Sequence, residues 1–152
     1  MRRIGHNISN SIRIKDPIGG GEIELYYRFP TTEERQQYSS SLFRARKGKV
    51  KTMVSETRQR FGKKILTGFR TGDFVLEEEG KELVFSSDKS SSDYREDWKA
   101  LILNSAADIV EAMAYHVFEG AAVVPDDDEE DDPHDDDNDS PKADDDGDVI
   151  KN

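Results

Sequence analysis

Residues 22–34 read EIELYYRFPTTEE, and this stretch carries a strand and the start of a helix in immediate succession. Polar and apolar residues alternate over 22–29, which is the period of a strand with one buried face. Pro30 ends that strand because its ring nitrogen has no hydrogen to donate to a ladder. Thr31, with Glu34 three residues later, predicts a capping box at a helix N-terminus. We therefore expect a strand over 22–29 and a helix that begins directly after Thr31.

Towards the N-terminus, residues 11–15 alternate in the same way and predict a partner strand. Residues 16–21, DPIGGG, separate the two strands and have strong turn chemistry. We interpret the three glycines as loop residues rather than a phosphate cradle, because no GxGxxG or Walker pattern accompanies them. This part of the chain predicts a β-hairpin, preceded by a loose N-terminus over 1–10.

Towards the C-terminus, the capping box predicts a helix with Tyr38, Leu42 and Ala45 on one face. Residues 46–49, RKGK, predict a break or a kink. A second helix is expected over 50–66, because its apolar residues recur at spacings of three, four and seven. Gly62 lies inside this helix, where glycine costs up to about 1 kcal/mol relative to alanine.

The rest of the chain predicts a second hairpin followed by further helices. Residues 67–73 are expected to be a connector, and residues 74–76 and 82–85 predict strands that turn around Gly80. Asp93 is expected to start a helix that residues 104–105 interrupt. Ser105 with Asp108 is expected to cap the final helix, which Gly120 ends.

These elements predict an α+β fold, a helix-dominated small domain with two β-hairpins and a disordered acidic C-terminal tail. The folded domain is expected over 11–124 and the tail over 125–152. Hydrophobic residues make up 34% of the chain and charged residues 36%, so we expect a modest core beside an unfolded part. The large residues expected in that core are Phe61, Phe69, Phe74, Phe85, Trp98 and Phe118.

The acidity of the chain is concentrated in its tail. The chain has 33 acidic and 22 basic residues, of which 15 and two lie in 126–152, so this segment carries −13 and the remainder +2. Like charges at this density repel one another and favour an extended, disordered segment. Residues 144–147, DDDG, match the middle of a calcium-binding loop, but Lys142 occupies its first ligand position. We expect no metal site.

A basic segment lies near the middle of the chain and supplies the candidate partner-binding residues. Glu56 is the one acidic residue within 44–64. Three interpretations remain open: a helix that neutralises nucleic-acid phosphates, a solvated helix face, or a site for an acidic partner or for the tail itself. The nine basic residues are Arg44, Arg46, Lys47, Lys49, Lys51, Arg58, Arg60, Lys63 and Lys64.

Residues suited to catalysis are scarce. The chain has no cysteine, which excludes disulfides and a cysteine nucleophile. His6 and His134 fall in segments expected to be loose, and His116 is a lone histidine on the final helix. No GxSxG or HExxH pattern is present. We therefore expect a protein that is not an enzyme and uses no cofactor.

The N-terminus has no apolar stretch behind Arg2 and Arg3, so a secretory signal is not expected. No apolar run approaches the roughly 20 residues of a membrane-spanning helix. We therefore expect no membrane partner and a cytoplasmic location.

Two segments together resemble the small, short-form tail assembly chaperones of long-tailed bacteriophages. The first is YRFPTTEER at 27–35, which resembles the Arg-x-Pro-Thr entry to a helix in that family. The second is GKELVFS at 80–86, followed by helices that reach IVEAM at 109–113. The resemblance covers about 27–119, and the Asp-rich tail has no counterpart in the family pattern.

The resemblance implies a partner-binding role in virion morphogenesis, located in the cytoplasm of the bacterial host. Proteins of this family keep the long, helical tape-measure protein soluble during tail assembly and help to deliver tail-tube subunits. The resemblance thus implies the tape-measure protein and the tail-tube protein as partners. Two alternatives stay open: a nucleic-acid-binding protein whose basic helix is autoinhibited by the acidic tail, and a minor virion structural protein.

Overall fold

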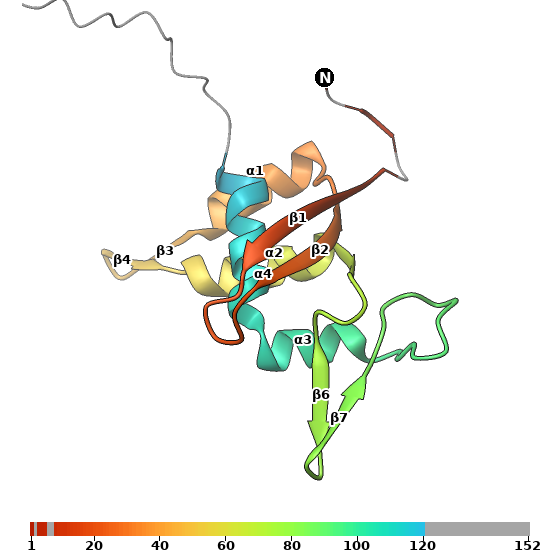
Figure 1. Cartoon of the computed structure of the whole chain (residues 1–152). Helices are drawn as coiled ribbons and strands as arrows, with labels where there is room; N and C mark the ends of the chain where they lie inside the picture. Colours follow the sequence, from red (N-terminus) through yellow and green to blue (C-terminus); the bar gives the residue numbers. More distant parts are fainter. Residues whose placement is uncertain (2, 6–7, 121–152) are drawn as a thin grey trace, which may run out of the picture. The chain divides into compact units, whose positions relative to one another are not determined.

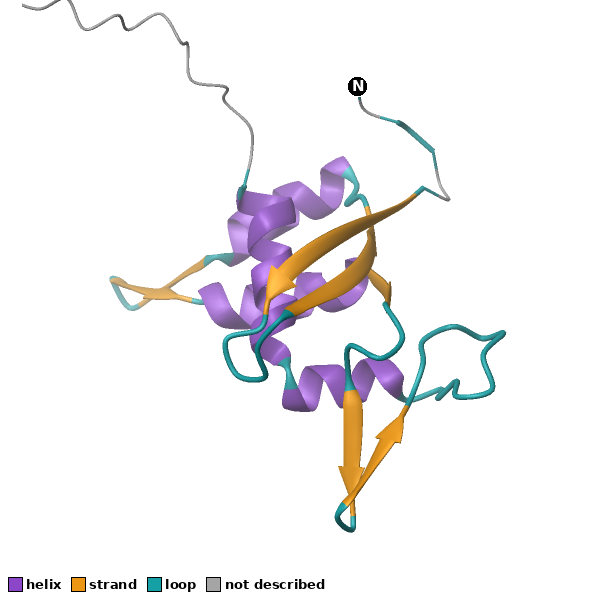
Figure 2. Cartoon of the chain, viewed as in Figure 1, coloured by secondary structure: helices purple, strands orange, loops and turns teal. Residues whose placement is uncertain are grey.

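The computed structural model describes residues 1, 3–5 and 8–120 of the chain. The chain divides into two units, Met1–Ala122 and Val123–Asn152. The second unit lies outside the described residues, and so does the expectation of a disordered tail over 125–152. The first unit is α+β, as predicted, with helices gathered behind the long strands β1 and β2 (Figure 1, Figure 2).

The central sheet has three antiparallel strands in the order β1 (Ser9–Lys15), β2 (Glu22–Arg28) and β5 (Leu66–Phe69). The predicted first hairpin is confirmed, although β1 begins at Ser9, within the stretch expected to be loose. The register places Ile12 opposite Leu25 and Ile14 opposite Ile23, so the apolar residues share the buried face.

Strand β5 was not predicted, because residues 67–73 were expected to be a connector. Phe69 lies opposite Leu25 and Gly68 opposite Tyr26, which adds β5 to the free edge of β2. A Cβ placed on Gly68 would lie 2.9 Å from the Ser87 Oγ. Glycine is therefore present here because the 86–88 loop packs against the strand, and it does not mark a turn.

Helix α1 (Thr32–Ser41) begins with the predicted capping box. The Glu34 amide donates to the Thr31 Oγ1 (3.1 Å), and the Thr31 amide donates to the Glu34 Oε1 (3.1 Å). The Arg28 guanidinium, from the end of β2, donates to both Glu34 carboxylate oxygens at 2.7 and 2.9 Å. These hydrogen bonds from Arg28 lower the pKa of Glu34 to about 2. Glu34 thus joins the sheet to the first helix.

Replacing Glu34 with Gln is expected to lower the free energy of unfolding by about 1 kcal/mol at neutral pH, because the ion pair with Arg28 is lost, while the Gln side chain can still accept the hydrogen bond from the Thr31 amide. The depressed pKa of Glu34 means that its contribution is present above about pH 4.5 and is lost as the pH falls towards about 2. The difference between wild type and variant should therefore shrink over this range in urea titrations followed by circular dichroism. Glu33→Gln, which removes an exposed first-turn charge outside the box, is the matched control. Equal losses in both variants at neutral pH would contradict the assignment.

The segment after α1 is a hairpin, which corrects the prediction of helix over most of 42–53. Strands β3 (Phe43–Arg46) and β4 (Lys49–Thr52) pair in antiparallel fashion, and α2 (Val54–Ile65) begins only after them. Lys47 and Gly48 form the turn with φ of 51° and 74°. Two successive residues with positive φ make the tight turn that matches the twist of a two-residue hairpin. The predicted break at 46–49 was thus the turn of a hairpin.

The predicted hairpin around Gly80 is confirmed, with strands β6 (Val75–Glu78) and β7 (Lys81–Val84). Helix α3 (Trp98–Ser105), helix α4 (Ala107–Ala114) and the π-helix η1 (Tyr115–Glu119) follow. The interruption near 104–105 is confirmed, whereas the expected caps are wrong. Asp97 and Ala106 occupy the N-cap positions, and neither makes a side-chain capping hydrogen bond.

The core lies between the sheet and helices α2, α3 and α4. Phe69 is 2% exposed, and its ring centroid lies 5.2 Å from that of Phe74, 5.2 Å from that of Phe85 and 5.9 Å from that of Trp98. Of the six predicted large core residues, four are buried, while Phe74 and Phe118 are half-buried and pack against the core. Helices α2 and α4 approach closely at Gly62, where an added Cβ would lie 2.7 Å from the Val110 Cγ1.

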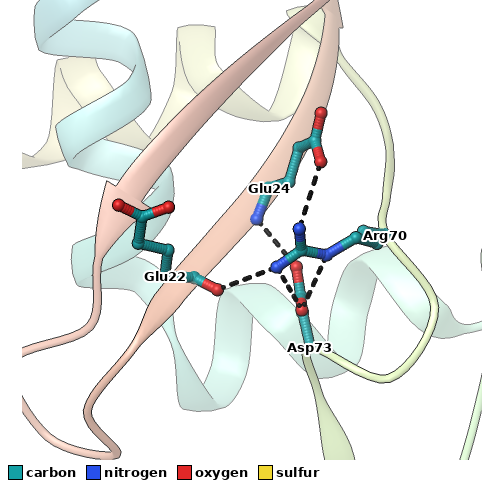
Figure 3. A network of polar contacts seen from close by, with 4 residues as sticks. All are labelled: Glu22, Glu24, Arg70 and Asp73. Carbon is teal, nitrogen blue, oxygen red and sulfur yellow. Dashed lines mark hydrogen bonds and ion pairs between the residues drawn. The ribbon is translucent and has the colours of Figure 1, made fainter.

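A polar network holds the end of β5 against β2 (Figure 3). Asp73 accepts a hydrogen bond from the Glu24 amide at 2.8 Å and from the Arg70 guanidinium at 3.0 and 3.1 Å. Arg70 also reaches the Glu24 carboxylate at 3.4 Å and the Glu22 carbonyl at 3.1 Å. These groups use their hydrogen bonds on one another, so we assign the network a structural role. It fixes the point at which the chain leaves β5 for hairpin β6–β7.

Candidate partner-binding site

The structure distributes the nine candidate basic residues over two consecutive elements. Five belong to the hairpin β3–β4 and its turn, namely Arg44, Arg46, Lys47, Lys49 and Lys51. The other four, Arg58, Arg60, Lys63 and Lys64, belong to α2. The hairpin takes the place of the end of the first expected helix, the break at 46–49 and the start of the second expected helix, so the nine basic residues do not all lie on helices.

Arg58 is engaged inside the fold. Its Nε and Nη2 lie 2.8 and 3.2 Å from the Glu119 carboxylate, and its guanidinium lies 4.8 Å from the centre of the Tyr115 ring. The Tyr38 hydroxyl donates to the same carboxylate at 2.5 Å. We call Tyr38, Arg58 and Glu119 the clamp. It joins α1, α2 and η1.

The pKa shifts within the clamp reflect the pairing of the Arg58 guanidinium with the Glu119 carboxylate. The hydrogen bond from Arg58 lowers the pKa of Glu119, and the same bond raises the pKa of Arg58. Burial, followed by the hydrogen bond to Glu119, raises the pKa of Tyr38. Arg58 therefore stabilises the position of the π-helix and does not present a free charge to a partner.

Arg60 and Lys64 remain on the surface of α2, one turn apart. The Arg60 Nη2 donates to the Ser41 Oγ at 2.9 Å, and its guanidinium lies 5.0 Å from the centre of the Phe61 ring. The Lys64 Nζ lies 4.8 Å from the same ring. Both cations thus lie over the ring of Phe61, a side chain that is itself buried.

Two clefts open beside these cations, and we call them together the α1–α2 groove. Their volumes are about 320 and 350 Å³, and both are lined by Ser40, Ser41 and Arg60. The smaller cleft adds Gln37, Phe61 and Lys64, and the larger adds Phe43, Met53, Glu56 and Thr57.

The lining of the α1–α2 groove favours a protein segment that combines apolar and acidic side chains. Phe43 is 59% exposed, which is unusual for a large aromatic residue, and Met53 is half-buried beside it. Methionine adapts its shape to varied apolar surfaces. Arg60 and Lys64 supply positive charge, and the groove lining contains a single acidic residue, Glu56.

A larger cleft of about 610 Å³ lies between the central sheet and the 86–88 loop. Two of its polar side chains are bonded within the fold: the Ser87 Oγ accepts from the Phe69 amide at 3.0 Å, and Arg28 is paired with Glu34. The lining includes Ser87 and Asp88, but the Asp88 carboxylate accepts from the Ser90 amide and hydroxyl, and the Ser87 hydroxyl is bonded to the Phe69 backbone. We therefore place the candidate site at the α1–α2 groove.

Sequence reasoning found the cations of the groove and missed its other lining residues. The sequence predicts helix at Phe43 and Met53, so it does not predict that they lie together beside Ser41 at the end of α1. The alternation of FRAR and KVKT around Lys47 and Gly48 was the available signal for the hairpin. Glu119 was not recognised as the partner of Arg58, because 61 residues separate them.

No protein-family model, curated protein or solved structure matches the chain. In the part of the chain that the structure describes, none of the helices has the length and apolar character required to traverse a membrane.

Proposed function

We propose that the chain is a tail assembly chaperone of a long-tailed bacteriophage, acting in the cytoplasm of the bacterial host. Its client would be the tape-measure protein, and tail-tube subunits would be a further partner. The proposal joins the resemblance of residues 27–119 to that family with a surface suited to a protein client.

The α1–α2 groove is the observation that carries this proposal. An exposed Phe43 and a half-buried Met53 offer apolar contact, while Arg60 and Lys64 offer positive charge beside them. A client helix with apolar residues on one face and acidic residues at its border would be held by both. The long, helical tape-measure protein is the member of the tail-assembly machinery whose apolar faces need such cover before the tail forms.

Co-expression tests the proposal directly. The full chain should keep the long helical protein encoded in the same tail gene cluster soluble and should co-purify with it. Arg60→Glu combined with Lys64→Glu should reduce the recovered client at least about tenfold, because two attractive charges become repulsive. Lys89→Glu, a charge reversal on the exposed 86–92 loop, is the control. Client that stays soluble without the chain, or that co-purifies equally with the groove variant, would argue against the proposal.

Nucleic-acid binding is the second candidate, and the hairpin β3–β4 is the observation that favours it. Five of its ten residues are basic and none is acidic. A two-stranded ribbon fits the major groove of DNA. Binding to a labelled duplex should then weaken steeply with salt and be lost in Lys47→Glu with Lys49→Glu. If the fluorescence anisotropy of the labelled duplex does not change when the protein is added at low salt, nucleic-acid binding is excluded.

A further inference from the structure

The two free-standing hairpins of the folded unit carry opposite charge. Hairpin β3–β4, residues 43–52, has five basic residues and no acidic one. Hairpin β6–β7, residues 75–84, has four glutamates, Glu77, Glu78, Glu79 and Glu82, against Lys81 alone. One element is thus +5 and the other −3, although the whole of 1–125 is nearly neutral.

The register also places residues of like charge at opposed positions in each hairpin. Glu77 lies directly opposite Glu82 in the β6–β7 register. In β3–β4 the register places Arg44 opposite Lys51 and Arg46 opposite Lys49. Directly opposed like charges destabilise an antiparallel pair. Among the described residues, the ion pairs of β6–β7 amount to one, from Glu78 to Arg95 at 3.9 Å, so most of this charge has no internal compensation.

Both hairpins also expose apolar side chains and open edges. Val75 and Val84 are opposite each other and about half exposed, at 49% and 50%, and Leu83 is 41% exposed. Phe43, at the base of β3, is 59% exposed. Within the described part of the chain, each hairpin is a sheet of two strands only, so the outer edge of each strand pairs with no third strand. Such edges accept another strand unless charge opposes the pairing.

The charge on each hairpin determines which other hairpin its edges can approach. Two acidic hairpins repel each other, and so do two basic hairpins. An acidic hairpin and a basic hairpin attract each other, and their apolar residues then come into contact. Figure 1 shows β3–β4 and β6–β7 leaving different sides of the same folded unit, so the two hairpins of one copy do not contact each other.

We propose that the chain self-associates head to tail, with the basic hairpin β3–β4 of one copy docked on the acidic hairpin β6–β7 of the next. The contact uses different surfaces on the two copies. Each added copy therefore presents a further free hairpin of each kind, and assembly continues to a ring or an open chain. This association is independent of the proposed chaperone function and does not require a client.

Sedimentation of the full-length chain tests the association. Wild type should show a weight-average mass that rises with protein concentration at about 50 mM salt. The association constant should fall at least about tenfold at about 500 mM salt, because the Debye length then shortens severalfold. A mass that stays monomeric at low salt, up to the solubility of the protein, would overturn the proposal.

Two charge variants define the contact. Glu77→Lys with Glu82→Lys changes the charge of β6–β7 from −3 to +1, and Lys47→Glu with Lys49→Glu lowers the charge of β3–β4 from +5 to +1. Each should be monomeric alone, with a circular dichroism spectrum like that of wild type. Mixed together, they should form a capped 1:1 dimer and nothing larger, since each retains one intact hairpin. Glu96→Lys and Lys89→Glu, exposed reversals on 86–97, should assemble as wild type does.

Persistent association of the β6–β7 variant would overturn the proposal, because another acidic segment, such as residues 126–132 of a second copy, would then be the partner of the basic hairpin. Failure of the two variants to combine would overturn it as well.

Discussion

Replacing Phe69 with Ala is expected to lower the free energy of unfolding by about 3–5 kcal/mol, the range for removing a large aromatic side chain from a packed core. Phe69 is 2% exposed and contacts three aromatic rings, those of Phe74, Phe85 and Trp98. Its strand β5 is also the third strand of the central sheet. A loss of this size is a large part of the total stability of a small domain.

Urea titration followed by circular dichroism measures this loss. Phe69→Leu keeps most of the apolar volume and should cost about 1.5 kcal/mol or less, which provides a measurable variant if the alanine variant does not fold. Phe43→Ala is the matched control, because Phe43 is 59% exposed and should cost well under 1 kcal/mol. Similar losses for Phe69→Ala and Phe43→Ala would show that Phe69 is not at the centre of the core.

Replacing Gly62 with Ala is expected to destabilise the protein, although helix propensity alone predicts the opposite. Alanine should gain up to about 1 kcal/mol over glycine in a helix interior. The new Cβ, however, would lie 2.7 Å from the Val110 Cγ1 and 3.1 Å from the Val110 carbonyl oxygen. Val110 is fully buried, so relief requires α2 and α4 to separate. At contacts this short the overpacking cost should be about 2–3 kcal/mol, the upper part of its usual range. After the gain in helix propensity, a net loss of about 1–2 kcal/mol remains.

The same titration measures the sign of this effect. Gly62→Leu should lower the free energy of unfolding more than Gly62→Ala, because the larger side chain clashes more strongly with Val110. Lys63→Ala, at the exposed neighbouring position on α2, should change the stability by no more than about 0.5 kcal/mol. A stabilised Gly62→Ala would mean that the two helices separate at little cost and that propensity decides.

The features predicted correctly from the sequence were those with a local cause. The capping box at Thr31 and Glu34 involves residues within one turn of each other, and the hairpin around Gly80 has its turn residue between two alternating segments. The α+β class follows from these patterns, because the residues that form each cap or turn are close together in the sequence.

The features that were missed depend on contacts between distant residues or on ambiguous local patterns. Val50 and Met53 have helical spacing, and arginine and lysine favour helices, so the sequence predicts helix on both sides of the break where the structure has the hairpin β3–β4. The sequence predicts a connector at Gly68, whereas the close approach of Ser87 to β5 explains the glycine. Arg58 belonged to the candidate site by charge alone, and only the fold brings Glu119 and Tyr38 to it.

The position of Trp98 gives the protein an intrinsic optical probe. The chain has one tryptophan, which is 8% exposed and packed against Phe69. Neither hairpin 43–52 nor hairpin 75–84 contains a tryptophan or a tyrosine. Indole fluorescence therefore reports the hydration of the core alone. Docking at either hairpin should leave the emission maximum in place, whereas unfolding should shift it to longer wavelength, so a binding curve and an unfolding curve can be separated in one cuvette without a label.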